Sequence, residues 1–426
     1  MNARELAINV LYKIEYGEGY SNVTLDKELE KADLINVEKA LASELVYGVL
    51  TWKLTLDEII KEYSSIRLKK ISPWILNILR IGIYQIVFLD KIPPSAAVNE
   101  SVNLAKKYGH EASSKFVNAI LRKIEKNEMD KLLEYLKTKP YTETELISIV
   151  TSHPVWMVEE LLKDYDKKFV VELLNANNIT PGVTLRVNSL KTSREELLKL
   201  LELKNIECEM GKLPNSIYVK KMTDFSGQLF SVQDEAAQMA CLKLEAKPGE
   251  AVLDACSAPG GKTTYLAELM KNQGVIDAWD MHPHRVKLVE DAAHKLGISI
   301  IHTEVKDASV YHASYEKKYD KILLDVPCSG LGVIRKKPDI KWTRKVEDIQ
   351  ELSSIQEKIL NMCASYLKPG GKTVYSTCTV IKKENEEQIE KFLNGHSDFH
   401  LVEKVNLYPN IDGTDGFFIA VLSRDE

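Results

Sequence analysis

Hydrophobic residues recur every three to four positions through the first third of the chain, which is the period of an α-helix. The first such stripe consists of Ala3, Leu6, Ala7, Val10, Leu11 and Ile14. Similar stripes run through residues 37–50, 54–63, 73–89, 95–108 and 114–124. No alternating pattern of comparable length interrupts them. The first 128 residues are therefore expected to form an all-α bundle of about six helices with short connections.

The middle of the chain mixes helical stripes with short strands. Residues 127–140 are charged and are expected to link the bundle to the next unit. Helical spacing returns over 142–175, where His153 is expected to be a packed or capping residue. The strands and helix expected beyond it cover residues 185–187, 194–203 and 216–220. Residues 140–230 are thus expected to form a small α+β module, from which no activity can be derived.

In the last third, strands alternate with helices. The expected strands cover residues 251–253, 274–279, 298–302, 321–324 and 372–375, with a late β pair near 400–402 and 417–422. This order predicts a doubly wound, Rossmann-like α/β domain over residues 231–426. Ligands of such sheets bind at the carboxyl ends of the strands, where Asp254, Cys256, Asp280, Asp307, Asp325 and Cys378 lie.

The stretch Ala251–Thr264, AVLDACSAPGGKTT, joins the first strand of that sheet to a helix. Its two adjacent glycines allow backbone N–H groups to approach a ligand, directly in front of the positive end of the helix. A phosphate-binding P-loop reads GxxxxGKT, but here Cys256 stands where the first glycine belongs. A nucleoside-binding loop requires an acid about 20 residues on for a ribose hydroxyl, and Asp280 stands there. The nucleoside interpretation is favoured.

Two of the six cysteines end neighbouring strands of the expected sheet. Cys328 lies in DVPCSG and Cys378 in STCT, beside polar residues at the mouth of the expected crevice. A thiol of ordinary pKa is only a few per cent ionised at neutral pH, so a nucleophile there needs an activating neighbour, for which Lys262 is a candidate. The cysteines expected to be small packed residues are Cys208, Cys241 and Cys363.

Composition narrows the class of protein. A net charge of −5 argues against a uniformly basic nucleic-acid binder, so any such contact must be local. No cysteine or histidine spacing predicts a metal site, and no stretch is apolar enough for a signal peptide or membrane span. A soluble, cytoplasmic protein without metal is expected.

Among basic segments, residues 61–80 are expected to be a solvated helix end rather than an RNA contact. Residues 335–345 instead favour RNA contact.

The motifs DACSAPGGKT, DVPCSG and STCT, in that order, resemble those of the RNA cytosine-C5 methyltransferases that use S-adenosyl-L-methionine. LRVNSL at 185–190, SVQDEAA at 231–237, ENEE at 384–387 and GFFIAVL at 416–422 are similar to further motifs of that family. The helical first third resembles a NusB-like RNA-binding domain. This combination is typical of the RsmB type, also called Sun or Fmu, which modifies 16S ribosomal RNA. One departure is Val326, where alanine is usual, and a slightly altered pocket wall is expected.

The resemblance implies a role for each site residue. Cys378 would attack carbon 6 of cytosine, Cys328 would assist release, and Asp325 would hold the base and border the cofactor. The residues implied to surround the methionine part of S-adenosyl-L-methionine are Cys256, Ser257, Ala258, Pro259, Gly260, Gly261 and Lys262. Asp280 would bind its ribose and Asp307 its adenine, with Arg285 supporting Asp280. Asp254 is expected to brace the loop rather than to react.

The implied partner is 16S ribosomal RNA, naked or in an assembling small subunit, and a monomer without membrane or metal is expected. Two other functions remain as alternatives. A P-loop nucleotide hydrolase would leave Cys256 and the Cys328/Cys378 pair unexplained. A non-catalytic RNA-binding assembly factor would have no reason to keep both cysteines together with Asp325.

Overall fold

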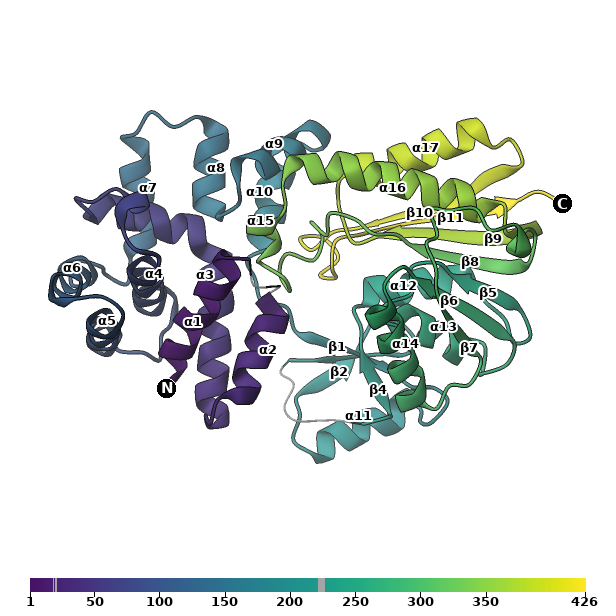
Figure 1. Ribbon diagram of the computed structural model, residues 1–426, viewed down its shortest axis with the longest axis horizontal. Helices are drawn as coiled ribbons and strands as arrows, with labels where there is room; N and C mark the ends of the chain where they lie inside the picture. Colours follow the sequence, from purple (N-terminus) through teal and green to yellow (C-terminus); the bar gives the residue numbers. More distant parts are fainter. Residues whose placement is uncertain (18, 20, 221–226) are drawn as a thin grey trace. The chain divides into compact units, whose positions relative to one another are not determined.

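The computed structural model describes residues 1–17, 19, 21–220 and 227–426 (Figure 1). Its internal contacts divide the chain into two compact units. A helical unit comprises Met1–Ile179 together with Ile334–Arg344, and a sheet unit comprises Thr180–Val333 together with Lys345–Glu426. Within the described residues, no helix combines the length and apolar character needed to cross a membrane.

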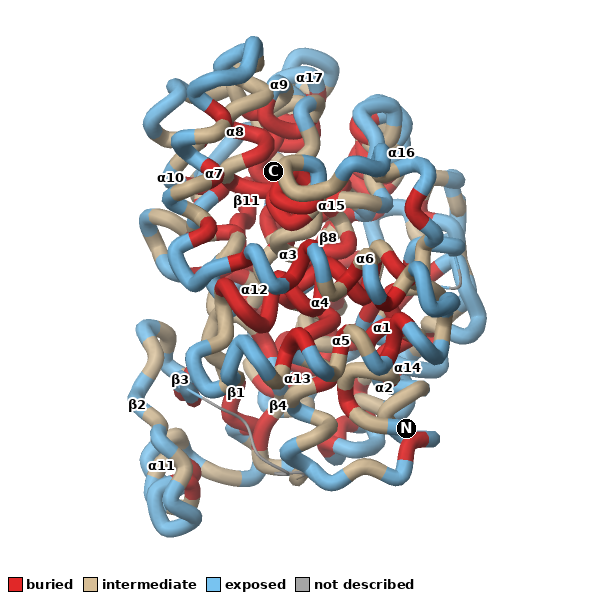
Figure 2. The backbone as a smooth tube through the Cα atoms, turned by 90° about the vertical axis from the view of Figure 1, so that its left-hand side faces the viewer, coloured by how far each residue is buried: buried red, intermediate tan, exposed pale blue. Residues whose placement is uncertain are grey.

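The helical unit confirms the predicted all-α bundle. Its helices are α1 (Ala3–Glu15), α2 (Ser21–Lys31), α3 (Asn36–Tyr63), α4 (Pro73–Phe88), α5 (Pro94–Tyr108), α6 (Glu111–Leu121), α7 (Glu128–Lys137), α8 (Glu143–Thr151), α9 (Val155–Asp164) and α10 (Lys167–Ala176), with a 3₁₀ turn η1 (Leu68–Lys70). The central helix is α4, in which every residue from Asn77 to Val87 is buried (Figure 2). Ser72 accepts a hydrogen bond from the N–H of Ile75 and Pro73 occupies the first turn, so the sequence fixes where this helix starts.

The polar residues inside α4 have partners. The guanidinium of Arg80 donates to both carboxylate oxygens of Asp57 at 2.7 and 2.8 Å and to Glu15 at 2.7 Å. Asn77 also donates to Glu15. A charge buried in an apolar core is tolerated only when it is paired and hydrogen-bonded. These pairs explain how an otherwise hydrophobic helix carries an arginine at its centre.

The expectation that residues 127–140 form a link is wrong. Most of this stretch is helix α7, whose Leu132 and Leu136 are buried in the core of the helical unit. The two leucines lie four residues apart on one face, while exposed Glu134 and Lys137 lie on another. The charged composition reflects the solvated face of an amphipathic helix and not a linker.

His153 is buried and its Nδ1 lies 2.7 Å from the carbonyl oxygen of Thr151, as expected for a packed residue.

The segment Ile334–Arg344 belongs to the helical unit although it follows Cys328 in the chain. It contains the short helix α15 (Ile340–Thr343). Lys341 is buried and donates to the carbonyl oxygen of Thr51 at 3.0 Å and to Asn178 at 2.6 Å. Trp342 packs on the helical core and donates to the carbonyl oxygen of Leu50 at 2.7 Å. The predicted RNA contact is therefore wrong for these two residues, whose side chains are occupied by structural contacts.

The first part of the sheet unit is a small antiparallel sheet. Its elements are β1 (Val183–Val187), α11 (Arg194–Leu203), β2 (Cys208–Met210), β3 (Ser216–Val219) and β4 (Phe230–Val232), with strand order β2-β3-β1-β4. Leu185 and Val187 of β1 pack with Leu197 of α11 and Ile217 of β3 in a core of their own. Ser193 and Glu196 form a capping box at the start of α11. The strands and helix predicted at 185–187, 194–203 and 216–220 are confirmed, whereas the predicted helical stretch 142–175 forms α8, α9 and α10 of the helical unit.

The second part is a seven-stranded sheet of order β10-β11-β9-β8-β5-β6-β7. Its strands are β5 (Ala251–Asp254), β6 (Val275–Asp280), β7 (Ile301–Val305), β8 (Tyr319–Asp325), β9 (Leu367–Thr377), β10 (Phe399–Leu407) and β11 (Phe417–Arg424). Neighbours from β7 to β9 are parallel, whereas β11 runs antiparallel to β9 and to β10. This is the mixed α/β sheet that the sequence predicts, with the late β pair at its edge.

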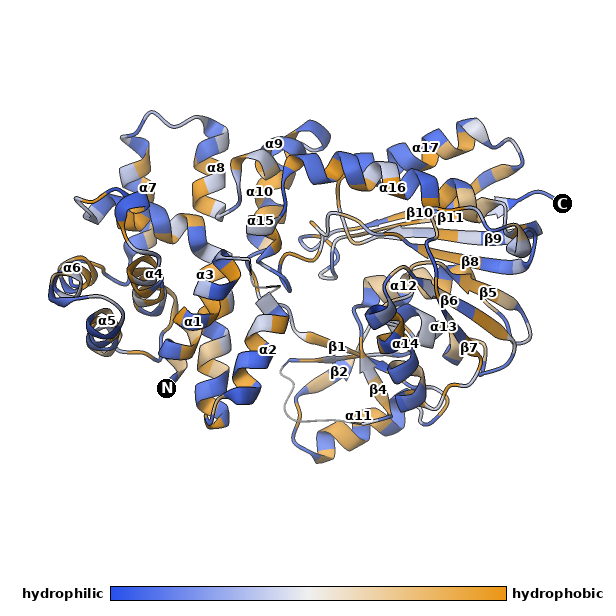
Figure 3. Cartoon of the chain, in the orientation of Figure 1, coloured by the Kyte–Doolittle hydropathy of each residue, from blue (hydrophilic) through white to orange (hydrophobic). Residues whose placement is uncertain are grey.

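Helices cover both faces of this sheet. They are α12 (Glu235–Leu244), α13 (Gly261–Leu269), α14 (Pro283–Leu296), α16 (Val346–Ala364) and α17 (Glu386–Gly395), with 3₁₀ turns η2 (Ala313–Tyr315) and η3 (Lys382–Glu384). One core includes residues of α12, α13 and α14, and another those of α16 and α17. Helix α16 mixes hydrophilic and hydrophobic residues along its length (Figure 3) because one face packs and the other is solvated. Parallel β5, β6, β8 and β9 consequently end at one edge.

Candidate functional site

The two candidate cysteines meet at the carboxyl ends of β8 and β9. Asp325 is the last residue of β8 and pairs in register with Ser376 of β9. Cys328 follows three residues later, and Cys378 directly follows β9. Their Sγ atoms lie 3.3 Å apart, and neither side chain is fully buried. Two thiols on separate turns can therefore reach one reacting atom.

The loop Cys256–Lys262 leaves β5 at the same edge of the sheet. Ser257 ties it to the next strand, because its hydroxyl and its N–H both donate to the carbonyl oxygen of Trp279. Gly260 has a φ of +100° and caps α13, and a Cβ at this position would lie 3.1 Å from the backbone of Val289. Only glycine suits both the positive φ and the close approach. The loop thus presents backbone N–H groups at the start of α13.

Lys262 connects this loop to the cysteines. Its Nζ donates to Asp325 Oδ2 at 2.7 Å, and Ser376 Oγ donates to Asp325 Oδ1 at 3.0 Å. Burial opposes the charge of Lys262, but the Asp325 carboxylate outweighs it and raises the pKa of the ammonium, with a smaller contribution from Cys378. The sequence could not place Lys262 beside the thiols. The structure places the Lys262 charge where it interacts with the Cys378 sulfur, so Lys262 remains the candidate activating neighbour.

The surroundings of the two thiols favour the protonated form of Cys328. Its pKa is raised by the hydrogen bond with the Cys378 sulfur, by burial and by the charges of Cys378, Glu384 and Asp325. Because the two sulfurs interact directly, the protonation of one thiol affects the other. The negative charges of Glu384 and Asp325 therefore oppose ionisation of Cys328.

Asp280 ends β6, the strand next to β5. It is buried, its Oδ1 accepts from the N–H of His282 at 3.0 Å, and its Oδ2 lies 3.2 Å from an amino nitrogen of Arg285. Arg285 also donates to the carbonyl oxygen of Ala258 at 3.2 Å, so it supports both the carboxylate and the loop. Asp307, at the exposed end of β7, accepts from the N–H and hydroxyl of Ser309. Asp307 is thus exposed and follows β7, the edge strand of the sheet.

We expect Asp280→Ala to weaken cofactor binding about a hundredfold or more, because two charge-assisted hydrogen bonds at about 1.5–3 kcal/mol each are lost. Isothermal titration calorimetry with S-adenosyl-L-methionine measures the effect. Asp291→Ala, which removes an exposed carboxylate from the following helix α14, is the matched control and should leave the dissociation constant unchanged. Equal affinity of the Asp280 variant and the control would show that another acid binds the ribose.

Asp254 braces the loop, in agreement with the sequence-based expectation. It is buried at the end of β5 and accepts from the hydroxyl of Thr263 at 2.7 Å. Burial raises its pKa to about 7, against the effect of the Thr263 hydrogen bond. Its position between the strand and the first turn of α13 fixes the loop at both ends. Within the described part of the chain, no cluster of histidine, cysteine, aspartate and glutamate could hold a metal ion.

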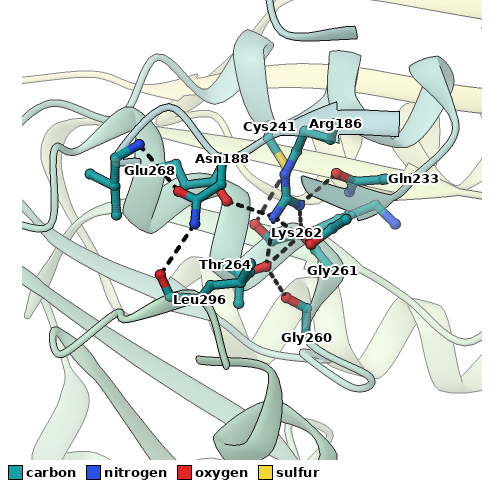
Figure 4. A network of polar contacts seen from close by, with 12 residues as sticks. Arg186, Asn188, Gln233, Cys241, Gly260, Gly261, Lys262, Thr264, Glu268 and Leu296 are labelled. Atoms are coloured by element: carbon teal, nitrogen blue, oxygen red, sulfur yellow. Dashed lines mark hydrogen bonds and ion pairs between the residues drawn. The ribbon is translucent and has the colours of Figure 1, made fainter. Parts of the chain in front are cut away.

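Sequence reasoning missed Arg186, which holds the other side of this loop (Figure 4). The guanidinium is fully buried and donates to the carbonyl oxygen of Gly261, to Thr264 and to Glu268, and it also binds Gln233 at 2.7 Å. Arg186 lies on β1, in the motif LRVNSL, far from the loop in sequence. The motif was visible, but the sequence gives no sign that its arginine reaches α13.

We expect Arg186→Met to cost about 3–5 kcal/mol in the free energy of unfolding, because it leaves the Glu268 carboxylate buried without its cation. The pKa of Glu268 is already raised to about 7 by burial, even with Arg186 present. The double variant Arg186→Met/Glu268→Met removes both charges and should recover most of the loss. Urea denaturation of the native protein, the single variant and the double variant measures the free energy of unfolding. Equal stability of the single variant and the native protein would contradict the pairing of Arg186 with Glu268.

Comparison with known proteins gives a consistent result along the chain. The model of the 16S rRNA methyltransferase RsmB/F family matches residues 241–423, the NusB family matches 1–126, and a ferredoxin-like domain of RsmF/B-like methyltransferases matches 153–226. A probable ribosomal RNA small subunit methyltransferase B of Bacillus subtilis is 38% identical over 99% of each chain. The ribosomal RNA small subunit methyltransferase B of Photorhabdus laumondii is 34% identical, also over 99% of each chain.

Solved structures agree with these relatives. The crystal structure of the protein PH0851 is 29% identical and covers 100% of this chain and 99% of its own, with a TM-score of 0.82. A methyltransferase homologue from Pyrococcus horikoshii is 27% identical over 67% of this chain and 99% of its own, with a TM-score of 0.58. Full-length identity above 30% to ribosomal RNA small subunit methyltransferases B, together with the three matched models, shows that this chain belongs to the RsmB/F family of 16S rRNA methyltransferases.

Proposed function

We propose that this protein methylates carbon 5 of a cytosine in 16S ribosomal RNA, using S-adenosyl-L-methionine as the methyl donor. The observation that carries the proposal is the pair of thiols, 3.3 Å apart, on the two turns that follow adjacent parallel strands. A methyltransferase acting on a nucleophilic oxygen or nitrogen needs no such pair. Carbon 5 of cytosine needs one thiolate to attack carbon 6, because the ring is electron-poor and must be activated before it can accept a methyl group, and the second thiol is then available for release.

In the proposed reaction, the Cys378 thiolate forms a bond to carbon 6 of the base. The electron pair of the C5–C6 double bond then becomes available at carbon 5, and Asp325 stabilises the charge that develops in the ring by holding its N3 side. After transfer, the carbon-5 proton passes to the Cys328 thiolate, the C–H electron pair restores the C5–C6 double bond and the C6–S electron pair returns to Cys378. Cys328 is assigned to this release step.

The loop and strand ends fit the cofactor. Gly260 has a φ of +100° and lets the loop lie close against α14, the start of α13 carries backbone N–H groups suited to an anionic ligand, and buried Asp280 ends the second strand, where a ribose diol binds. When bound, S-adenosyl-L-methionine supplies an electrophilic methyl group on sulfur. Residues Cys256–Lys262 are assigned to its methionine part, Asp280 to the ribose and Asp307 to the adenine. Arg285 orients Asp280, and Asp325 borders the methyl group.

We further propose that residues 1–128 and 140–230 act as RNA-binding modules and that residues 231–426 are the catalytic domain. The substrate is 16S ribosomal RNA, naked or in an assembling small subunit. The protein is proposed to act in the cytoplasm as a monomer. Residues of the basic segment 335–345 that remain exposed, such as Lys337 and Lys345, are proposed to contact the RNA backbone.

The test is to map 5-methylcytosine in 16S ribosomal RNA from cells with and without this protein. The proposal requires one cytosine that loses its carbon-5 methyl group when the protein is absent and regains it when purified protein and S-adenosyl-L-methionine are added. Binding of magnesium-ATP instead of S-adenosyl-L-methionine would favour a nucleotide hydrolase. Unchanged methylation together with altered subunit assembly would favour a non-catalytic assembly factor.

A further inference from the structure

Behind the two thiols lies a buried polar cluster centred on Glu384, the last residue of η3. Glu384 is fully buried, six residues after Cys378. Its Oε2 accepts from the N–H of Ser329 at 2.8 Å, and its Oε1 accepts from the hydroxyl of the same serine. Ser329 directly follows Cys328. One carboxylate therefore accepts from both the N–H and the hydroxyl of Ser329, the residue next to Cys328.

The same cluster also contacts the turn that carries Cys378. The hydroxyl of Ser329 lies 2.8 Å from that of Thr379, which directly follows Cys378, and both are buried. Asn385, next to Glu384, donates to the carbonyl oxygen of Thr379 at 3.0 Å. Its Oδ1 accepts from the hydroxyl of Thr377 at 2.6 Å. The pair Glu384–Asn385 thus fastens residues beside both cysteines.

A third element closes the cluster. Gln356, buried on α16, donates through Nε2 to Glu384 Oε2 and to the carbonyl oxygen of Pro327, each at 2.9 Å. Pro327 directly precedes Cys328, so the turn is held on both sides of the thiol. The hydroxyl of Tyr375 on β9 donates to the backbone carbonyl of Glu384 at 2.7 Å and fixes the glutamate to the sheet. Burial raises the pKa of Glu384, while the donors from Ser329, Gln356 and Thr379 oppose this rise.

We propose that Glu384 is a positioning residue that sets the place of the Cys328 turn relative to Cys378 and thereby controls release of the methylated base. The inference rests on the proposed function. In the release step, the carbon-5 proton passes to the Cys328 thiolate, whose own proton has gone to solvent, and the C–H electron pair closes the C5–C6 double bond. The C6–S pair leaves as the Cys378 thiolate. This step needs Cys328 and Cys378 in the correct relative position, whereas the attack on carbon 6 needs only Cys378.

The choice of step follows from how each turn is held. The Cys378 turn continues directly from β9, and Asn385 holds Thr377 and Thr379 on either side of the thiol, so this turn has supports besides Glu384. The Cys328 turn lies beyond the end of β8, and Ser329 beside its thiol is held by Glu384 through two hydrogen bonds. A displacement of about 1 Å at a reacting group can cost on the order of a hundredfold in rate. Loss of the carboxylate should therefore displace Cys328 more than Cys378.

The test uses the full-length chain with Glu384→Gln, in which an amide N–H₂ replaces an acceptor that faces donors. After a single turnover with target RNA and S-adenosyl-L-methionine, denaturing electrophoresis measures the covalent protein–RNA species over time. We expect its decay to slow at least about tenfold while its formation changes less than about threefold. Calorimetry should give an unchanged cofactor affinity, because none of the described contacts of Glu384 involves the loop Cys256–Lys262.

Two further variants separate positioning from folding. Gln388→Met removes a neighbouring buried amide that donates to the carbonyl oxygen of Lys383, and it should leave both rates within twofold. Ser329→Ala keeps Glu384 but removes the hydroxyl that joins the two turns, and it should slow decay in the same direction if the glutamine variant does not fold. Equal slowing of formation and decay, or unchanged decay in Ser329→Ala, would overturn the inference. Absence of methylation by the native protein would instead overturn the proposed function.

Discussion

Cys378→Ala should abolish methyl transfer, with the rate falling at least about a thousandfold, while the affinity for S-adenosyl-L-methionine survives. The nucleophile cannot be replaced from the rest of the site, because covalent activation of carbon 6 has no substitute among carboxylates and hydroxyls. Cofactor affinity is retained because Cys378 lies across the sheet edge from the loop Cys256–Lys262, on the turn after β9. Transfer of a labelled methyl group to RNA and calorimetry with the cofactor measure the two quantities separately.

Cys208→Ala is the matched control for this experiment. It removes a half-buried thiol from β2 of the small sheet, in a core separate from that of the large sheet, and should leave transfer unchanged. The native protein should lose activity on alkylation of its thiols, and prior binding of cofactor and RNA should protect it. Substantial turnover by the Cys378 variant would remove the nucleophile assignment and leave the cysteine as a packing residue.

The site could be predicted from the sequence where it depends on strand order. Parallel strands end at one edge of a sheet, so residues that follow consecutive strands meet, whatever the details of packing. This is why Asp254, Asp280 and Asp325 could be expected at one edge. The 3.3 Å separation of Cys328 and Cys378 follows from the same rule, since β8 and β9 are direct neighbours. The sequence also marked Gly260 and Gly261 as the place where the backbone can approach a ligand, but it did not predict the φ of +100° that Gly260 adopts.

Long-range side-chain contacts could not be predicted. Arg186 reaches Gly261 from another sheet, and no period or local motif encodes that distance. Lys341 and Trp342 stand in a basic segment, yet they are occupied by Thr51, Asn178 and Leu50 from the helical unit. Composition describes such a segment as solvated because it counts charges and not their partners. A run of charged residues indicates solvent exposure only when their side chains do not donate to backbone carbonyl groups from distant parts of the chain.

The contacts around Glu384 are also long-range contacts that the sequence does not predict. The sequence places ENEE six residues after Cys378, but nothing local shows that the first glutamate turns inward and binds Ser329, 55 residues earlier. A buried carboxylate is costly unless several donors satisfy it, so its presence behind two thiols indicates a function for the donors it holds. Those donors flank the cysteines. The catalytic turns are therefore held by polar contacts from behind as well as by the strands from which they emerge.

Cys328→Ala should accumulate a covalent protein–RNA species when mixed with target RNA and S-adenosyl-L-methionine. Removing this thiol spares the attack by Cys378 and the methyl transfer, but the step that removes the carbon-5 proton loses its neighbouring group. The hydrogen bond between the two thiols, burial and the nearby charges raise the pKa of Cys328 in the free protein, and Cys378 is the thiol assigned to the attack. The adduct at carbon 6 then persists because the C6–S bond cannot break before the proton leaves.

The trapped species should survive denaturing electrophoresis and carry both a labelled methyl group and labelled RNA. The double variant Cys328→Ala/Cys378→Ala should not form it, since no sulfur remains to bind carbon 6. Cys363→Ala, which removes a buried cysteine from α16, serves as the control and should turn over without an adduct. If Cys328→Ala turned over freely, its assignment to release would be lost. If Cys378→Ala trapped RNA instead, the roles of the two thiols would be exchanged, because the sulfur that remains bound is the one that attacked.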